Sequence, residues 1–271
     1  NRVGGESVWL GEFLSVTARL YARECCPPGE EREWLLALAE EMLQAVEQSG
    51  WNGQWYTRAF FQDGRPMGEA GCAIDVIAQA WAAAAGVAED RARSAMDQAW
   101  AQLADPQLGI IRLLTPPFGG EGPDPGYIAA YPPGVRENGG QYTHGACWGI
   151  MGWAALGQGQ RAWQALHMLM PYAHADSREG ARRYRVEPYV AAGDVYGQPP
   201  LAGRGGWTWY TGAAGWMFRT ALISLMGYQR RGDQVRLQAL LPPQWQQAAL
   251  RVRVGASRYT LWARRDVTQP Q

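Results

Sequence analysis

The chain has 271 residues, with 25 basic and 25 acidic side chains and therefore no net charge, and 31 of its residues are aromatic (14 Trp, 12 Tyr and 5 Phe). A neutral chain lacks the basic excess of nucleic-acid binders and of polybasic membrane-surface proteins, and no apolar run reaches the roughly 18 residues needed to cross a bilayer. Few charges and many rings favour a protein that binds an uncharged, ring-shaped ligand; a Trp-rich core is the alternative.

Helices dominate the first part of the chain. Apolar residues at helical spacing predict helices over 6–24, 30–48, 73–85 and 90–103, separated by Pro- and Gly-containing breaks. Residues 109–140 are so rich in Pro and Gly that they predict a long irregular loop, which in a compact domain is usually functional.

Helical periodicity returns over 142–156, 160–170, 188–196 and 212–226. After that, two alternating runs joined by Gly255-Ala256-Ser257 predict a β-hairpin. The fold class is therefore all-α with a short C-terminal β appendix, and long loops between paired helices suit an α/α toroid.

Cysteine spacing and the first residues indicate the cellular compartment of the protein and whether the chain is part of a longer polypeptide. The four cysteines form no Cys-x-x-Cys pair, which predicts reduced thiols in the cytoplasm and neither a disulfide framework nor a metal site. The first residues carry no initiator Met and no signal peptide, so we expect this chain to be part of a longer polypeptide.

The densest group of polar side chains lies just before the predicted helix over 142–156. Within nine residues it offers a cation, a carboxylate, two amides, a phenol and an imidazole, including those of Arg136, Glu137, Gln141, Tyr142 and His144. The N–H groups at a helix start favour an anion. The alternative is a loop that only turns the chain and caps the helix.

A second candidate is the glycine-rich segment that ends in Thr211 and Gly212. A hydroxyl and unpaired N–H groups at the start of a helix have the make-up of a phosphate or sulfate cradle. The segment has no Lys and no preceding strand, so it fits neither a Walker loop nor a dinucleotide fingerprint. Alternatively, its small residues only permit close helix packing.

Two further segments suggest sugar binding. Trp51 and Trp55 flank amide side chains, so their rings could stack on a sugar while the amides bind hydroxyls; the alternative is a loop that packs on its own helix ends. Glu187 lies beside an aromatic residue, and with Glu137 it would form the acid/base pair of a sugar-active enzyme. A non-catalytic carbohydrate-binding module competes with that reading, but an anion cradle favours an enzyme that uses phosphate.

At these segments the chain resembles the glycoside phosphorylases of glycoside hydrolase family 94. The residues of its motifs resemble most those of the cyclic β-1,2-glucan synthase and β-1,2-oligoglucan phosphorylase branch. The matching stretches cover essentially the whole chain: GESVWLGEFL (5–14), WNGQWYTRAF (51–60), LLTPPF (113–118), YPPGVRENGGQYTHGACW (131–148), YRVEPYV (184–190) and GRGGWTWYTGAAGW (203–216).

The resemblance implies that residues 1–229 form the C-terminal part of an (α/α)6 barrel and that residues 230–271 form the β appendix. It also implies inverting phosphorolysis of β-glucosides, of the β-1,2-glucan or the cello-oligosaccharide type, by inorganic phosphate. This reaction gives an α-sugar 1-phosphate and needs only one protein carboxylate. In the family that general acid is an Asp in a segment before the match to Asn1. No catalytic residue is therefore expected in this chain, and the segment alone is expected to be inactive. An inverting hydrolase of the α/α toroid type is the alternative.

For the site, the resemblance implies that His144, Thr211 and Gly212 hold phosphate. The expected substrate-binding residues are Arg136, Glu137, Gln141, Tyr142, Trp51, Trp55 and Glu187. We expect no cofactor apart from phosphate as co-substrate. The expected partners are a β-glucan oligosaccharide and the rest of a longer polypeptide, with no nucleic acid and no membrane contact by this segment; a homodimer and a tether to the inner membrane through a larger parent chain are left open.

Overall fold

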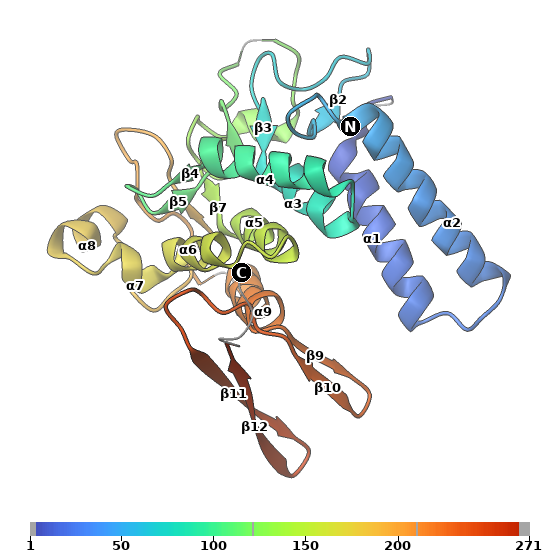
Figure 1. Ribbon diagram of the computed structural model, residues 1–271. Helices are drawn as coiled ribbons and strands as arrows, with labels where there is room; N and C mark the ends of the chain where they lie inside the picture. The colour runs from blue at the N-terminus through green and yellow to red at the C-terminus, as the bar shows by residue number, and fades with distance from the viewer. Residues whose placement is uncertain (1–3, 121, 210, 266–271) are drawn as a thin grey trace.

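The computed structural model describes residues 4–120, 122–209 and 211–265. Helices, several of them joined in pairs, form the body of this part of the chain (Figure 1). The longer helices are α1 (Val8–Glu24), α2 (Glu30–Ala45), α3 (Val76–Ala85), α4 (Glu89–Leu103), α5 (Thr143–Ala155), α6 (Gly159–Leu169) and α9 (Thr211–Arg219).

Short two-stranded bridges tie the loops together at one end of these helices. The antiparallel pairs are β1 (Glu6–Ser7) with β2 (Ala59–Phe60), β3 (Ile74–Asp75) with β6 (Leu114–Thr115), β4 (Ala104–Asp105) with β5 (Ile110–Ile111), and β7 (Gln141–Tyr142) with β8 (Asp194–Val195). Strands β1, β3 and β7 each run directly into a helix, namely α1, α3 and α5. The bridges therefore gather the long loops around the N-terminal ends of three helices.

The main core lies where α3 packs against α1, α4 and α5. Helix α3 is apolar on all sides and almost wholly buried, as expected of a helix surrounded by others. Glycine permits its close approach to α5: a Cβ at Gly152 would lie 2.9 Å from the Cα of Ala80. Trp153 on α5 is fully buried, and its Nε1 donates a hydrogen bond of 3.1 Å to the carbonyl of Met96 on α4.

Most of the predicted helices are confirmed, but the one over 188–196 is wrong. Two short helices, α7 (Pro171–His174) and α8 (Arg178–Tyr184), come before it instead. Arg185 then takes a left-handed conformation, with φ of 56°, that ends α8. The following residues form turns and strand β8. The backbone N–H and C=O groups of β8 make their hydrogen bonds to β7 instead of within a helix.

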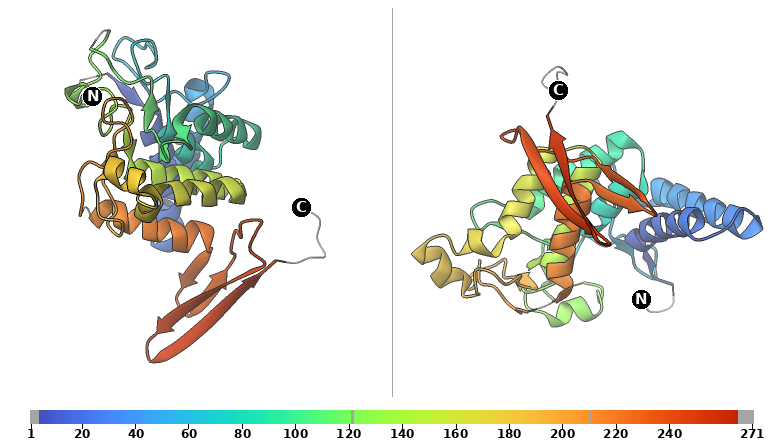
Figure 2. Two further views of the ribbon diagram at one scale, coloured as in Figure 1. Left: turned by 90° about the vertical axis from the view of Figure 1, so that its left-hand side faces the viewer. Right: turned by 90° about the horizontal axis from the view of Figure 1, so that it is seen from below.

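Two hairpins follow the last helical turn, which ends at Leu225. The predicted hairpin is confirmed as β11 (Gln247–Val254) and β12 (Ser257–Arg264), and it projects from the helical body (Figure 2). The sequence patterns missed the other hairpin, β9 (Tyr228–Arg231) with β10 (Gln234–Leu237). The division into domains at residue 229 stays a prediction.

The structure contains all four cysteines as free thiols, and the expectation that they are reduced in the cytoplasm stays a prediction. Within the described residues, no helix combines the length and the apolar character needed to cross a membrane.

Candidate functional site

A cavity of about 630 Å³ lies at the N-terminal ends of α1, α3 and α5, where the bridged loops meet. Its lining combines aromatic rings with charged and polar side chains. The principal lining residues are Ser7, Trp9, Arg58, Asp75, Tyr127, Glu137, Tyr142, His144 and Trp148. We call this space the charged cavity.

Asp75 anchors one wall of the charged cavity. Its Oδ1 caps α3 by accepting hydrogen bonds from the backbone N–H groups of Ile77 (2.7 Å) and Ala78 (3.0 Å). Its Oδ2 pairs with Nε of Arg58 at 3.2 Å, and the Asp75 side chain is only 2% exposed. Burial raises the pKa of Asp75, whereas Arg58 and the two backbone donors oppose that rise.

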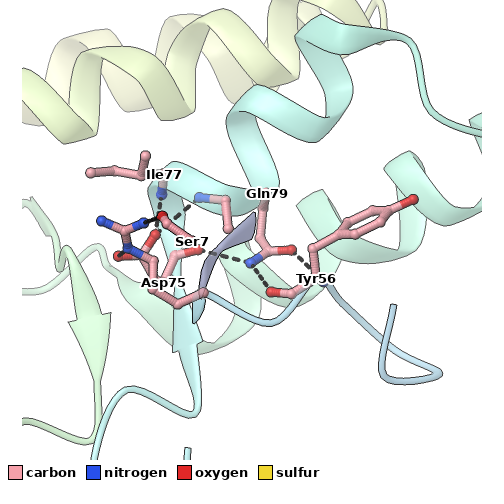
Figure 3. A network of polar contacts seen from close by, with 7 residues as sticks. Ser7, Tyr56, Asp75, Ile77 and Gln79 are labelled. Atoms are coloured by element: carbon pink, nitrogen blue, oxygen red, sulfur yellow. Dashed lines mark hydrogen bonds and ion pairs between the residues drawn. The ribbon is translucent and has the colours of Figure 1, made fainter. Parts of the chain in front are cut away.

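Arg58 connects this wall to the start of α1. Its Nη1 donates a hydrogen bond to Oγ of Ser7 at 3.3 Å, and its guanidinium lies 5.1 Å from the centroid of the Trp9 ring. Gln79 fixes the loop that carries Arg58, because its amide exchanges hydrogen bonds with the backbone N–H (2.8 Å) and C=O (2.9 Å) of Tyr56 (Figure 3).

Glu12, on α1, is a buried carboxylic acid near this ion pair. Its side chain is fully buried, and neither carboxyl oxygen has a hydrogen-bond partner among the described residues. Burial raises its pKa well above the usual value, with Arg58 lowering it and Asp75 raising it further. The protonated acid is therefore strongly favoured at this position.

Glu137 also lines the charged cavity, and Arg136, which does not line it, pairs with Glu137. The Arg136 guanidinium lies among three rings, 5.3 Å from the centroid of Tyr131, 5.8 Å from Trp207 and 5.9 Å from Tyr142. Its Nε is 3.4 Å from Oε2 of Glu137, and both side chains are less than one-fifth exposed. The ring cluster thus holds Arg136, and Arg136 holds the Glu137 carboxylate at the cavity wall.

His144 stands in the first turn of α5. Its ring stacks on Trp216 of α9 (5.0 Å between centroids, 27° between planes) and meets the edge of Trp148 at 4.5 Å. Its Nε2 is buried and has no hydrogen-bond partner in the described part of the chain. Burial lowers the pKa of His144, so the imidazole is neutral at pH 7 and keeps one ring nitrogen for a ligand.

Thr211 and Gly212 lie apart from the charged cavity. Both are exposed at the start of α9, and Thr211 lines a smaller cavity of about 190 Å³ with Tyr189 and Trp209. Helix α9 packs against α5. Trp216, which lies on α9 after Thr211 and Gly212, stacks on His144. The two predicted phosphate-binding segments therefore touch through this ring contact, but they do not line the same cavity.

Other predicted substrate contacts also lie outside the charged cavity. Trp51 packs on Tyr56 (5.1 Å between ring centroids), and Nε1 of Trp55 donates a hydrogen bond of 2.7 Å to the carbonyl of Ala73. Gln141 is buried, and its Oε1 accepts a hydrogen bond from the Ile111 backbone at 3.0 Å.

Glu187 is half-buried in the turn that precedes Val190, and it does not line the charged cavity either. Of the ten predicted site residues, the structure brings Glu137, Tyr142 and His144 to the lining of this cavity and Arg136 into contact with two of them.

Sequence reasoning missed Arg58, Asp75, Trp9 and Trp148 as cavity residues. Asp75 carried a usable signal, since an Asp directly before a run of helix formers is an N-cap signature. Arg58 and Trp9 stand within matched motifs, but only the pairing of β1 with β2 shows that they meet.

Paired helices, whose connecting loops enclose rings, carboxylates and a neutral imidazole, define a class of protein: a carbohydrate-active domain of the α/α type. Comparison with known proteins agrees. Residues 1–227 match the family described as the glycosyl hydrolase 94 superfamily, catalytic domain, and the chain belongs to this family. This membership confirms the resemblance noted in the sequence and implies a fragment of the (α/α)6 type.

The relatives are named as a glucan synthase and as phosphorylases. The chain is 46% identical over 277 residues to the cyclic beta-(1,2)-glucan synthase NdvB of Rhizobium meliloti (strain 1021), covering 98% of this chain and 10% of that protein. It is 31% identical to the solabiose phosphorylase of Paenibacillus borealis (91% and 33% covered) and 29% identical to the N,N'-diacetylchitobiose phosphorylase of Vibrio furnissii (90% and 31%). The chain therefore spans a third or less of these relatives.

Proposed function

We propose that this chain supplies the sugar- and phosphate-binding part of an inverting glycoside phosphorylase, with β-1,2-glucan as its substrate class. The phosphorylases among its relatives support the reaction, and its identity to a cyclic β-1,2-glucan synthase supports the linkage. The observation that carries the proposal is His144: a neutral imidazole with a buried, unpaired Nε2 on the wall of a cavity lined with rings and carboxylates.

In this proposal His144 donates a hydrogen bond to a phosphate oxygen. A neutral imidazole does so without giving up its proton, and a donor already in place stabilises the negative charge of the transition state. Thr211 and Gly212 stay predicted phosphate contacts, but they are not donors to this anion, because Thr211 lines a separate cavity. Anion recognition in the charged cavity is thus assigned to His144 on α5.

Sugar recognition is assigned to other lining residues of the charged cavity. The Glu137 carboxylate accepts hydrogen bonds from sugar hydroxyls, the Tyr142 hydroxyl adds a further polar contact, and the rings of Trp9 and Trp148 face the sugar. Phosphate attacks the anomeric carbon while an acid protonates the glycosidic oxygen, so the bond to the leaving sugar breaks and an α-sugar 1-phosphate forms. We assign that acid to a part of the polypeptide before residue 1 and expect this segment alone to be inactive.

Phosphate dependence of the complete protein tests the reaction. With a β-1,2-linked glucose disaccharide as substrate, sugar 1-phosphate should form only when inorganic phosphate is present. Release of free glucose at the same rate without phosphate would show a hydrolase and overturn the proposal.

The assignment of His144 has its own test. His144→Ala should raise the KM for phosphate by about 10- to 100-fold, the loss expected for one hydrogen bond to a charged group, and should change the KM for the disaccharide much less. Trp34→Ala is the control, because that ring is exposed on α2 and lines neither the charged cavity nor the smaller cavity that Thr211 lines. Equal effects on both substrates would contradict the phosphate role.

No cofactor other than phosphate as co-substrate belongs to this proposal. The cytoplasmic location, the tether through a larger chain and the homodimer stay predictions.

A further inference from the structure

A second cavity, of about 610 Å³, lies on the side of α6, where the segment that precedes β11 passes over the helix. We call it the aromatic groove. Its lining residues are Pro106, Gln160, Trp163, Gln164, Leu166, His167, Met168, Met170, Tyr172, Pro242, Gln244 and Trp245. Among the residues that the structure describes, it shares no lining residue with the charged cavity.

The side chains of the aromatic groove are rings, amides and apolar groups. No Asp, Glu, Lys or Arg appears among its described lining residues, whereas Arg58, Asp75 and Glu137 line the charged cavity. A charged ligand that enters this groove would lose its hydration without gaining an ionic partner, and this cost disfavours its binding. The lining therefore selects an uncharged ligand.

The order of residues along α6 places rings and hydrogen-bonding groups on one face. Trp163 and Gln164 lie three and four residues after Gln160 and four and three residues before His167, so these side chains are neighbours on the helix surface. Gln244 adds an amide from the facing segment. Amides that both donate and accept next to a flat ring match neighbouring hydroxyls beside the apolar face of a sugar.

Backbone bonds hold the rings of this groove in place. Nε1 of Trp163 donates a hydrogen bond to the carbonyl of Leu240, and its ring lies 4.8 Å from that of Trp245 at an angle of 52°. The backbone N–H of Trp245 in turn donates to the Pro242 carbonyl at 2.9 Å. The Trp163 ring is therefore held in place, so ordering this side chain costs little when a ligand binds.

We propose that the aromatic groove is a second carbohydrate-binding site that takes an uncharged glucan chain. Trp245, 40% exposed, and Tyr172, 56% exposed, supply the ring faces that the ligand covers. The choice of a β-glucan as the ligand rests on the proposed function. The groove holds a polymer at a place separate from the reacting bond, so it raises the local concentration of chain ends near the charged cavity.

Calorimetry without phosphate tests the site directly, with the full chain and a linear β-1,2-glucan as the probe. The Glu137→Ala variant serves as the background, so that binding in the charged cavity is reduced. Trp245→Ala and Tyr172→Ala should each weaken glucan binding by about tenfold, the scale of one lost aromatic contact. Trp262→Ala and Tyr259→Ala are the matched controls, because these rings are 54% and 50% exposed on β12, outside the groove.

Two outcomes overturn this inference. The first is equal glucan affinity in Trp245→Ala and Trp262→Ala. The second is an unchanged glucan affinity in Trp245→Ala together with a changed sedimentation mass, which would show that the groove holds a polypeptide segment instead of a sugar.

These outcomes are separate from the fate of the proposed function. Binding is measured without phosphate, so a protein that fails to form sugar 1-phosphate can still show glucan binding that depends on Trp245. Conversely, if the protein is a phosphorylase but its glucan affinity does not change in Trp245→Ala, the proposed binding site is wrong and the proposed reaction still stands.

Discussion

The charged cavity and the aromatic groove differ in whether the polar atoms of their side chains have hydrogen-bond partners. In the charged cavity, His144 presents a buried nitrogen without a partner among the described residues, and the neighbouring Glu12 carboxyl is likewise unpaired. In the aromatic groove, the buried polar atom of Trp163 is bonded to backbone, and the amides face solvent. Unpaired buried polar groups reduce stability, so a fold retains them where they act on a ligand or on each other.

This difference indicates that a site for reaction and a site for ligand binding need different side chains. Charges that are held in place next to buried acids suit a site where charge develops during a reaction. Neutral rings and amides suit a site that only holds a ligand. We therefore expect the charged cavity to respond strongly to pH and to the loss of ionic partners, and the aromatic groove, whose described lining has no Asp, Glu, Lys or Arg, to respond less to both.

Loss of Arg58 should have the largest effect on stability. Arg58→Ala leaves the Asp75 carboxylate 2% exposed and without its ionic partner, and removes the nearest cation from Glu12. Breaking a buried pair costs about 3–5 kcal/mol of unfolding free energy, and we expect about 3 kcal/mol because Arg58 itself is 19% exposed. Denaturant unfolding measures the change.

A matched control and a second variant sharpen this prediction. Arg65→Ala breaks an ion pair with Asp63 in which both side chains are about half exposed, and should cost less than about 1 kcal/mol. Adding Asp75→Asn to Arg58→Ala should recover part of the loss, because the amide still caps α3 and carries no charge. Two losses that simply add would show that Arg58 and Asp75 do not act as a pair.

The second prediction concerns Glu12 and pH. Its raised pKa means that the folded protein keeps a proton that the unfolded chain releases above about pH 4.3, the ordinary value for Glu. Stability from this group is therefore fully present below that pH and falls by up to about 1.4 kcal/mol per pH unit until the raised pKa of the folded state is reached.

Glu12→Gln removes that slope. The variant should unfold at a higher temperature than the parent at pH 7, and the difference should vanish near pH 4, where the acid is protonated in both states. Glu41→Gln, an exposed change on α2, is the control and should shift neither value. A variant that is less stable than the parent at pH 7 would show that the ionised Glu12 is paired in the folded protein.

Much of the fold follows from the sequence pattern. Apolar periodicity places α1 to α6, and strict alternation places the β11–β12 hairpin. The predicted helix over 188–196 is wrong because strand β8 forms only through pairing with β7, some fifty residues away, and local periodicity carries no trace of such a partner. Helix α8 is too short for its periodicity to stand out.

The site was less predictable. Arg136 to His144 stood out because polar residues crowd one short segment. Arg58, Asp75 and Trp9 come from three separate segments, and only the bridges β1–β2 and β3–β6 bring them together. Trp55 was predicted as a sugar contact from its place in a polar loop; its indole is bonded to the backbone of Ala73 and packs on the core, and its role in sugar binding stays a prediction.

The smallest predicted effect concerns the aromatic groove. Trp163→Phe keeps a ring against Trp245 but removes the hydrogen bond to the Leu240 carbonyl, so it should cost about 1 kcal/mol of unfolding free energy. Because no ionisable group is introduced or lost, this cost should be the same at pH 5 and pH 8, in contrast to the pH-dependent gain in Glu12→Gln. Thermal unfolding at both values measures it. A cost that changes with pH would mean that the groove and the charged cavity are coupled, and would break the distinction between them.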